Sequence, residues 1–162
     1  MVDLRTAVED ALDQVSSAAA AMQVRIDTAL QQAQVTGDRV LLERLVSNLI
    51  DNAVRHNVTG GWVLAATRHE AAFAELTVAS SGEPITPGEV SGLFEPFRRI
   101  SGRAGSRSGT GLGLSIVASV ARAHGGRAEA TARPDGGLEV QVRLPATAHP
   151  DAYGPVLGRS QA

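Results

Sequence analysis

The chain has 162 residues, enough for one domain with a hydrophobic core, and a formal net charge of −2. That charge provides no attraction to polyanions, and an aromatic content of 3% leaves few rings for stacking bases, so no nucleic-acid partner is expected. The absence of cysteine excludes disulfides and thiolate metal sites. No apolar run reaches the length of about 18 residues that a membrane span requires, so we expect no membrane contact by this domain.

Apolar residues at helical spacing predict a first helix over residues 3–22, with Asp3 as its cap. Alternating residues at 24–28 predict a short strand, and Gly37-Asp38 begins a second helix. The apolar stripe of this second helix comprises Leu41, Leu45, Val46, Leu49 and Ala53. Its opposite, polar face comprises Arg44, Asn48, Asp51, Asn52 and Arg55.

The second half of the chain predicts two hairpins separated by a loop-rich span and a helix. Strands are expected at 62–67 and 73–79 around a turn at Arg68-His69-Glu70, then loops over 80–108 and a helix over 112–124. Strands at 127–132 and 138–144 flank a turn at 134–137. This order predicts an α/β two-layer sandwich with a mixed, mainly antiparallel sheet and helices on one face. Residues 1–145 are expected to form the domain and 146–162 a flexible C-terminal tail.

Two separated segments contain the residue types of a nucleotide pocket. Asn48 and Asn52 stand at i and i+4, hence on one helix face. The glycine-rich run 109–114 leads into an apolar helix start, where backbone N–H groups can hold phosphates. Each signal is weak alone, since isolated Asn residues more often belong to a solvated helix face and three glycines can form a hinge.

Together with Phe94-Glu95-Pro96-Phe97 between them, the two segments resemble the catalytic, ATP-binding domain of sensor histidine kinases. That domain belongs to an ATPase superfamily that includes DNA gyrase and the MutL repair proteins, and the resemblance covers residues 3–145. It implies a Bergerat-type ATPase fold that binds ATP and Mg²⁺.

The resemblance also implies roles for individual residues. Asn52 would coordinate Mg²⁺ through its side-chain oxygen, which suits a hard cation, and Asn48 would lie near the phosphates. Arg55 stands where the family usually has Lys and would oppose phosphate charge, while His56 would line the same helix end. The phosphate cradle and lid would comprise Gly109, Thr110, Gly111, Leu112, Gly113 and Leu114.

Residues 102–108 are small and polar and match the lid that closes over nucleotide in this family. Phe94 and Phe97 resemble the aromatic pair that anchors the lid, a role compatible with simple packing in the core.

The adenine side of the pocket departs from the family pattern. Where the family has Asp-x-Gly-x-Gly, this chain has Ser80 at the Asp position and Pro84 at the second Gly. Gly82 remains available for close approach of the base, and Ile85 for packing. A hydroxyl accepts a hydrogen bond without the charge assistance worth roughly 1–3 kcal/mol, so adenine binding about ten- to hundredfold weaker is expected.

The position four residues before Asn52 separates activities within the superfamily. Relatives that hydrolyse ATP have a Glu there as general base, and this chain has Asn48, so transfer to a protein histidine is favoured over hydrolysis. None of the four histidines lies in the His-Glu-x-Arg context of a phosphoacceptor helix. We therefore expect the phosphoacceptor histidine outside this chain.

The hypothesis is the ATP-binding catalytic domain of a two-component sensor histidine kinase, the cytoplasmic part of a membrane-bound sensor. Its partners would be its own dimerisation and phosphoacceptor helical domain and, downstream, a response regulator. Two alternatives stay open: a degenerate interaction module, suggested by Ser80 and Pro84, and an anti-sigma-factor kinase that phosphorylates serine on a partner.

Overall fold

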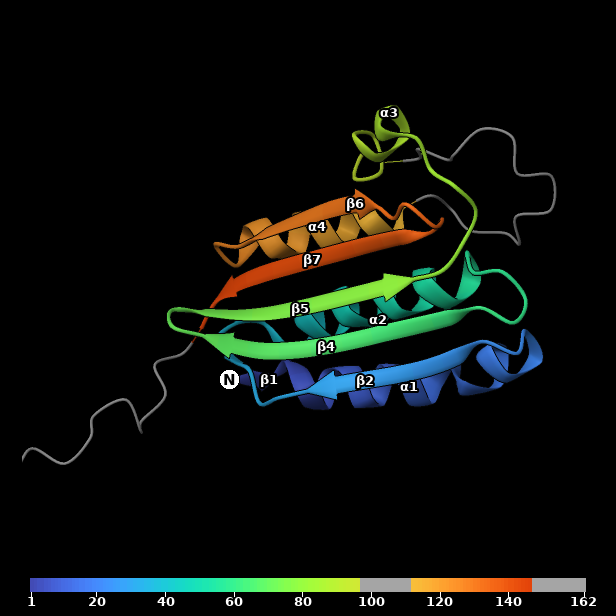
Figure 1. Ribbon diagram of the computed structural model, residues 1–162. Coiled ribbons are helices and arrows are strands. Elements are labelled where there is room, and N and C mark those ends of the chain that lie inside the picture. Colours follow the sequence, from blue (N-terminus) through green and yellow to red (C-terminus); the bar gives the residue numbers. More distant parts are fainter. Residues whose placement is uncertain (97–111, 147–162) are drawn as a thin grey trace, which may run out of the picture.

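The computed structural model describes residues 1–96 and 112–146 (Figure 1). Their elements in chain order are β1 (Val2–Asp3), α1 (Leu4–Ala21), β2 (Arg25–Leu30), β3 (Gln34–Val35), α2 (Arg39–Arg55), β4 (Trp62–Glu70), β5 (Phe73–Ser80), α3 (Pro87–Val90), α4 (Gly113–Ala123), β6 (Arg127–Ala132) and β7 (Leu138–Pro145). In these two ranges, every helix is too short or too polar to cross a lipid bilayer.

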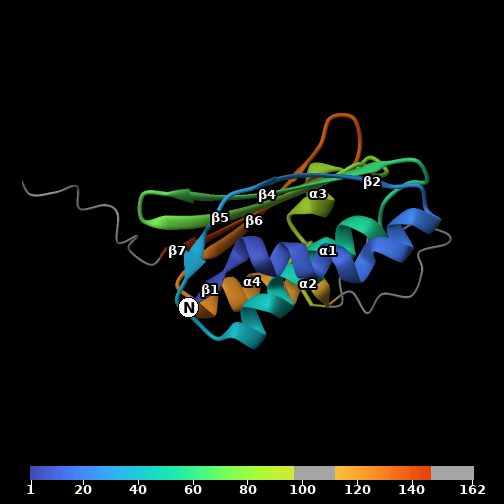
Figure 2. The same cartoon turned by 90° about the horizontal axis from the view of Figure 1, so that it is seen from below.

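The main sheet has the strand order β2-β4-β5-β7-β6. Strand β2 runs parallel to β4, and the other neighbouring pairs are antiparallel. The long helices α1, α2 and α4 lie on one face of this sheet, with α2 packed against both of the others (Figure 2). The predicted two-layer sandwich with a mixed, mainly antiparallel sheet is therefore confirmed.

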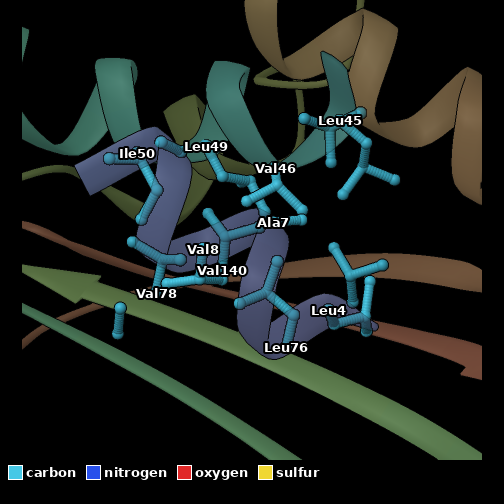
Figure 3. Packing of buried hydrophobic residues seen from close by; sticks show 14 of the residues in the cluster. Leu4, Ala7, Val8, Leu45, Val46, Leu49, Ile50, Leu76, Val78 and Val140 are labelled. Atoms are coloured by element: carbon cyan, nitrogen blue, oxygen red, sulfur yellow. The ribbon is translucent and has the colours of Figure 1, made fainter. Parts of the chain in front are cut away.

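The core lies between the helices and the sheet, where side chains from sequence-distant elements meet (Figure 3). Leu4 and Val8 of α1 face residues of α2 and of the central strands β5 and β7. Each such aliphatic side chain contributes about 1.5–3 kcal/mol when it is fully buried. The members labelled in Figure 3 are Leu4, Ala7, Val8, Leu45, Val46, Leu49, Ile50, Leu76, Val78 and Val140.

The predicted Asp3 cap is confirmed, and Asp38, predicted to stand at the start of the second helix, is the N-cap of α2. The Asp3 carboxylate accepts hydrogen bonds from the N–H groups of Arg5 (3.0 Å) and Ala33 (3.1 Å), so it caps α1 and ties it to the chain before β3. Asp38 accepts from the N–H of Leu41 at 3.0 Å. Leu41 itself is 40% exposed, contrary to its predicted place in the buried stripe. It stands seven residues before Asn48 and so lies on the polar face of α2.

The predicted turn at Arg68-His69-Glu70 is wrong, because β4 continues through these residues and the chain reverses at Ala71 and Ala72. Arg68 Nε lies 2.7 Å from a carboxylate oxygen of the buried Glu75 on β5, and Arg143 Nε of β7 lies 3.4 Å from the other. The hydrogen bond and charge of Glu75 raise the pKa of Arg68. These ion pairs between strands help to keep Arg68, His69 and Glu70 in β4, paired with β5.

Three short elements were not predicted. Helix α3 begins with a capping box in which Thr86 and Glu89 bond each other's backbone, a signal that the sequence Thr-Pro-Gly-Glu already contained. Strands β1 and β3 are two residues each, too short for periodicity to detect. Of the predicted tail, Ala146 still donates its N–H to Ala72 O at 2.8 Å, and residues 147–162 lie outside the described residues.

His124 connects the end of α4 to the beginning of α2. Its Nδ1 lies 2.8 Å from Val120 O and therefore carries the proton, because a carbonyl only accepts. Its Nε2 accepts from the Asp38 N–H at 3.2 Å. Gly37 has no room for a Cβ, which would stand 2.6 Å from that Nε2. The imidazole thus links the C-terminus of α4 to the N-terminus of α2, the two antiparallel helices beside the candidate site.

Replacing His124 by Ala should lower the free energy of unfolding by about 1–2 kcal/mol, because the hydrogen bond to the Asp38 N–H at the start of α2 and the hydrogen bond to Val120 O within α4 are both lost. Urea denaturation followed by circular dichroism measures this. His124→Gln, whose amide both donates and accepts, should recover part of the loss. Equal stability of His124→Ala and the parent chain would contradict the proposed role of the ring.

Candidate functional site

Asn48 stands on the polar face of α2 and points its oxygen toward the start of α4. Its Nδ2 donates to Arg44 O at 2.8 Å, which orients the amide so that Oδ1 points away from the backbone of α2. A Cβ at Gly113 would lie 3.6 Å from Asn48 Oδ1, so the first helical residue of α4 is its neighbour. Asn48 and Gly113, which belong to the two motifs predicted to form one pocket, are thus adjacent in space.

The N-terminus of α4 has the features of an anion site. The helix begins at Gly113, and Leu112 at its N-cap provides no side-chain hydrogen bond. Buried Leu114 anchors the first turn in the core. The N–H groups of a first turn have no partner inside the helix and lie at the positive end of its dipole. Phosphate oxygens are suitable acceptors for such groups.

Asn52 lies one turn beyond Asn48 on the same face and is half-buried. Within residues 1–96 and 112–146, the Asn52 side chain makes no hydrogen bond, which leaves its amide oxygen available. In the same ranges, no group of three or more His, Cys, Asp or Glu side chains could hold a metal ion. A single amide oxygen fits a Mg²⁺ ion that takes its other ligands from phosphate and water.

Arg55 forms a two-point ion pair within α2. Its Nε lies 3.0 Å from Asp51 Oδ2, and its Nη2 lies 3.1 Å from Asp51 Oδ1. From the sequence, Arg55 is predicted to oppose phosphate charge, and Asp51 has no predicted role. The i, i+4 spacing of an acidic and a basic residue was the signal that would have predicted this pair.

Ser80 ends β5 on the helix side of the sheet. It shares a strand face with Leu76 and Val78, whose side chains lie in the core, and it is 9% exposed. Its hydroxyl makes no hydrogen bond to other described residues. The neighbouring Ser81 is engaged differently, because its Oγ bonds Asn57 Oδ1 at 2.7 Å and so connects this segment to the end of α2.

The segment after β5 lies between the end of α2 and the turn that joins β6 to β7. A Cβ at Gly82 would be 3.4 Å from His56 O and 3.2 Å from Gly137 Cα. Gly137 adopts a φ of +91° and donates its N–H to Glu83 O at 3.1 Å. The sequence predicted a turn at 134–137 but not its contact with this segment. Ile85, predicted to pack on the adenine side, is partly buried and packs against the hydrophobic core.

Several predicted site residues lie outside the described residues: Phe97, the lid segment 102–108, Gly109, Thr110 and Gly111. Phe94 is described and packs against the core. With Pro96 and the outer side of α4 it lines a cavity of about 420 Å³, to which none of the predicted nucleotide-binding residues contributes.

The chain matches the protein family described as histidine kinase-, DNA gyrase B- and HSP90-like ATPase over residues 37–148. Among curated proteins it is similar to Sensor protein CutS of Streptomyces coelicolor, with 49% identity over 146 residues, 89% of this chain and 35% of the relative. It is also similar to Histidine protein kinase DivJ of Caulobacter vibrioides, with 34% identity over 152 residues, 88% of this chain and 26% of the relative. The chain therefore spans about a third or less of these relatives.

Among solved structures the chain resembles a mycobacterial sensor histidine kinase, MprB, with a TM-score of 0.80 and 31% sequence identity. The match covers 90% of this chain and 97% of that chain. The family match begins at residue 37, whereas the described fold also includes α1 and the strands β1, β2 and β3 before it.

Proposed function

We propose that this chain, which belongs to the histidine kinase-, DNA gyrase B- and HSP90-like ATPase family, is the ATP-binding catalytic domain of a sensor histidine kinase. It positions Mg·ATP for transfer of the γ-phosphoryl group to a histidine on a dimerisation domain outside this chain. The observation that supports this most directly is the approach of Asn48 Oδ1 to Gly113 at the start of α4. The domain works on the cytoplasmic side of a sensor and supplies a response regulator downstream.

The proposed roles follow from the chemistry of the residues on α2, at the start of α4 and at the end of β5. Asn52 provides an oxygen ligand for Mg²⁺, and the α4 N-terminus and Asn48 hold phosphate oxygens. Arg55 adds positive charge at the end of α2. Ser80, Gly82 and Ile85 form the adenine side. Asn52 would hold Mg²⁺, which when bound would supply positive charge to offset the negative charge of the phosphates.

The residues on the polar face of α2 also disfavour hydrolysis of ATP. An efficient ATPase needs a base that removes a proton from water. The residue one turn before Asn52 is Asn48, whose amide is no base at neutral pH, and its Nδ2 is already bonded to Arg44 O. Asp51 has a carboxylate on this face, but both of its oxygens contact Arg55. A positioned histidine from another domain is therefore the better acceptor.

With γ-labelled ATP, the isolated chain should neither label itself nor release phosphate at an appreciable rate. Added dimerisation domain from the same full-length protein should acquire acid-labile label. The transfer should be slow, because two separate molecules lack the effective concentration, in the millimolar range, that a short covalent linker provides. The measurement is autoradiography of the two proteins after acid and after alkali treatment.

Two results would contradict the proposal. Acid-stable label on a serine of another protein would support the anti-sigma-factor alternative. No nucleotide binding at millimolar concentration would support the interaction module, which the departures at Ser80 and Pro84 already suggest.

A further inference from the structure

We propose that Asp51 competes with the nucleotide phosphates for Arg55, and that this internal competition sets the affinity of the phosphate side of the site. The inference rests on the proposed ATP-binding function. It assigns a role to the carboxylate of Asp51, which pairs with Arg55 on the polar face of α2.

The competition follows from the geometry of the pair. Arg55 uses Nε and Nη2 for the two oxygens of Asp51, at 3.0 Å and 3.1 Å. This is the parallel, two-point arrangement with which a guanidinium also binds two oxygens of a phosphate. A phosphate that takes the same two N–H groups must therefore displace the carboxylate.

The carboxylate is also close to the expected phosphates. At about 100° per residue, Asp51 projects about 40° to one side of Arg55, and Asn48 and Asn52 project about 20° and 60° to the other. Asp51 therefore lies about 60° around α2 from Asn48, the phosphate-side amide, and about 100° from Asn52, the proposed metal ligand. Against an approaching anion, Asp51 cancels much of the positive charge of Arg55.

The exchange costs little because the pair is solvent-exposed. The side chains of Arg55 and Asp51 are 42% and 48% exposed, and ion pairs of this kind contribute little to stability. A multiply charged phosphate chain attracts Arg55 more strongly than a single carboxylate does. Removing the carboxylate should therefore strengthen phosphate binding without disturbing the helix.

The test compares Asp51→Asn with the parent chain by calorimetric titration at physiological ionic strength, where longer-range charge effects are screened. Affinity for Mg·ATP should rise about three- to tenfold, and affinity for adenosine should not change. Glu43→Gln is the matched control. Glu43 forms the other i, i+4 pair of α2, with Arg39 at 3.3 Å, but lies at the opposite end of the helix. The Glu43→Gln variant should leave Mg·ATP affinity unchanged.

A double-mutant cycle shows whether Asp51 acts through Arg55. In an Arg55→Ala background, the gain from Asp51→Asn should fall below about twofold, because only screened repulsion remains. If Asp51→Asn raises Mg·ATP affinity equally in the Arg55→Ala background, the inference is overturned, because Asp51 would then act on the phosphates by charge repulsion alone. Weaker Mg·ATP binding by Asp51→Asn would overturn it too, since Asp51 would then orient Arg55 for phosphate. If the parent chain and Ser80→Asp both bind no nucleotide, the proposed function itself fails.

Discussion

Replacing Asn52 by Ala is expected to weaken binding of Mg·ATP by about a hundredfold or more, because the only protein ligand proposed for the metal is removed. The loss should concern the metal-dependent part of binding. Affinity for ATP in the presence of EDTA should change much less. Isothermal titration with and without Mg²⁺ measures both quantities on the same protein.

The fold should not suffer from this substitution. Asn52 makes no hydrogen bond within the described residues, and its half-buried side chain lies outside the apolar stripe of α2. Ser47→Ala, a neighbouring small truncation on the same helix, is the control and should retain full Mg·ATP affinity. If Asn52→Ala bound Mg·ATP as tightly as Ser47→Ala does, with the same metal dependence, the metal assignment would be wrong.

Replacing Ser80 by Asp is expected to tighten ATP binding about ten- to hundredfold, because a charged acceptor for the adenine amino group replaces a neutral one. The position is suitable, since Ser80 ends β5 on the helix side with a hydroxyl that is not bonded to other described residues. Titration with ATP and with adenosine should show the same gain. Inorganic tripolyphosphate, which has no base, should show none.

A carboxylate at a position that is 9% exposed can destabilise the domain, so Ser80→Asn is the companion variant. Its amide oxygen is an uncharged acceptor, and we expect an affinity between those of the parent chain and Ser80→Asp. A folded Ser80→Asp that binds ATP no better than the parent chain would place the adenine elsewhere. Gains with tripolyphosphate would show that the substitution acts on the phosphates.

The sequence predicted most helices and strands because their signals are local. Asp3 precedes apolar periodicity and caps α1 as expected, and Asp38, expected at the start of the second helix, caps α2. The errors have local causes as well. Polarity at Arg68-His69-Glu70 indicated a turn, but pairing of Arg68 with the buried Glu75 keeps these residues in β4. The predicted apolar stripe of α2 includes Leu41, although the angle of Leu41 on the helix places it beside Asn48.

The candidate site was predictable in composition and not in arrangement. The sequence identified Asn48, Asn52 and the glycine-rich run as parts of one pocket through their resemblance to a family. It did not indicate that the turn of Gly137 packs on Gly82, nor that His124 joins the ends of α4 and α2. It also missed the pair of Asp51 and Arg55, although their spacing was visible.

The sequence by itself determined most of the longer helices and strands and most of their apolar faces, because spacing along the chain sets these properties. Only the tertiary structure decided which parts of the site meet. Because α2 lies between α1 and α4, Asn48 lies next to Gly113. The order of strands in the sheet places the β6–β7 turn against the segment after β5. Such contacts join residues far apart in the chain. Their positions depend on how whole elements pack around a shared core, which no local pattern encodes.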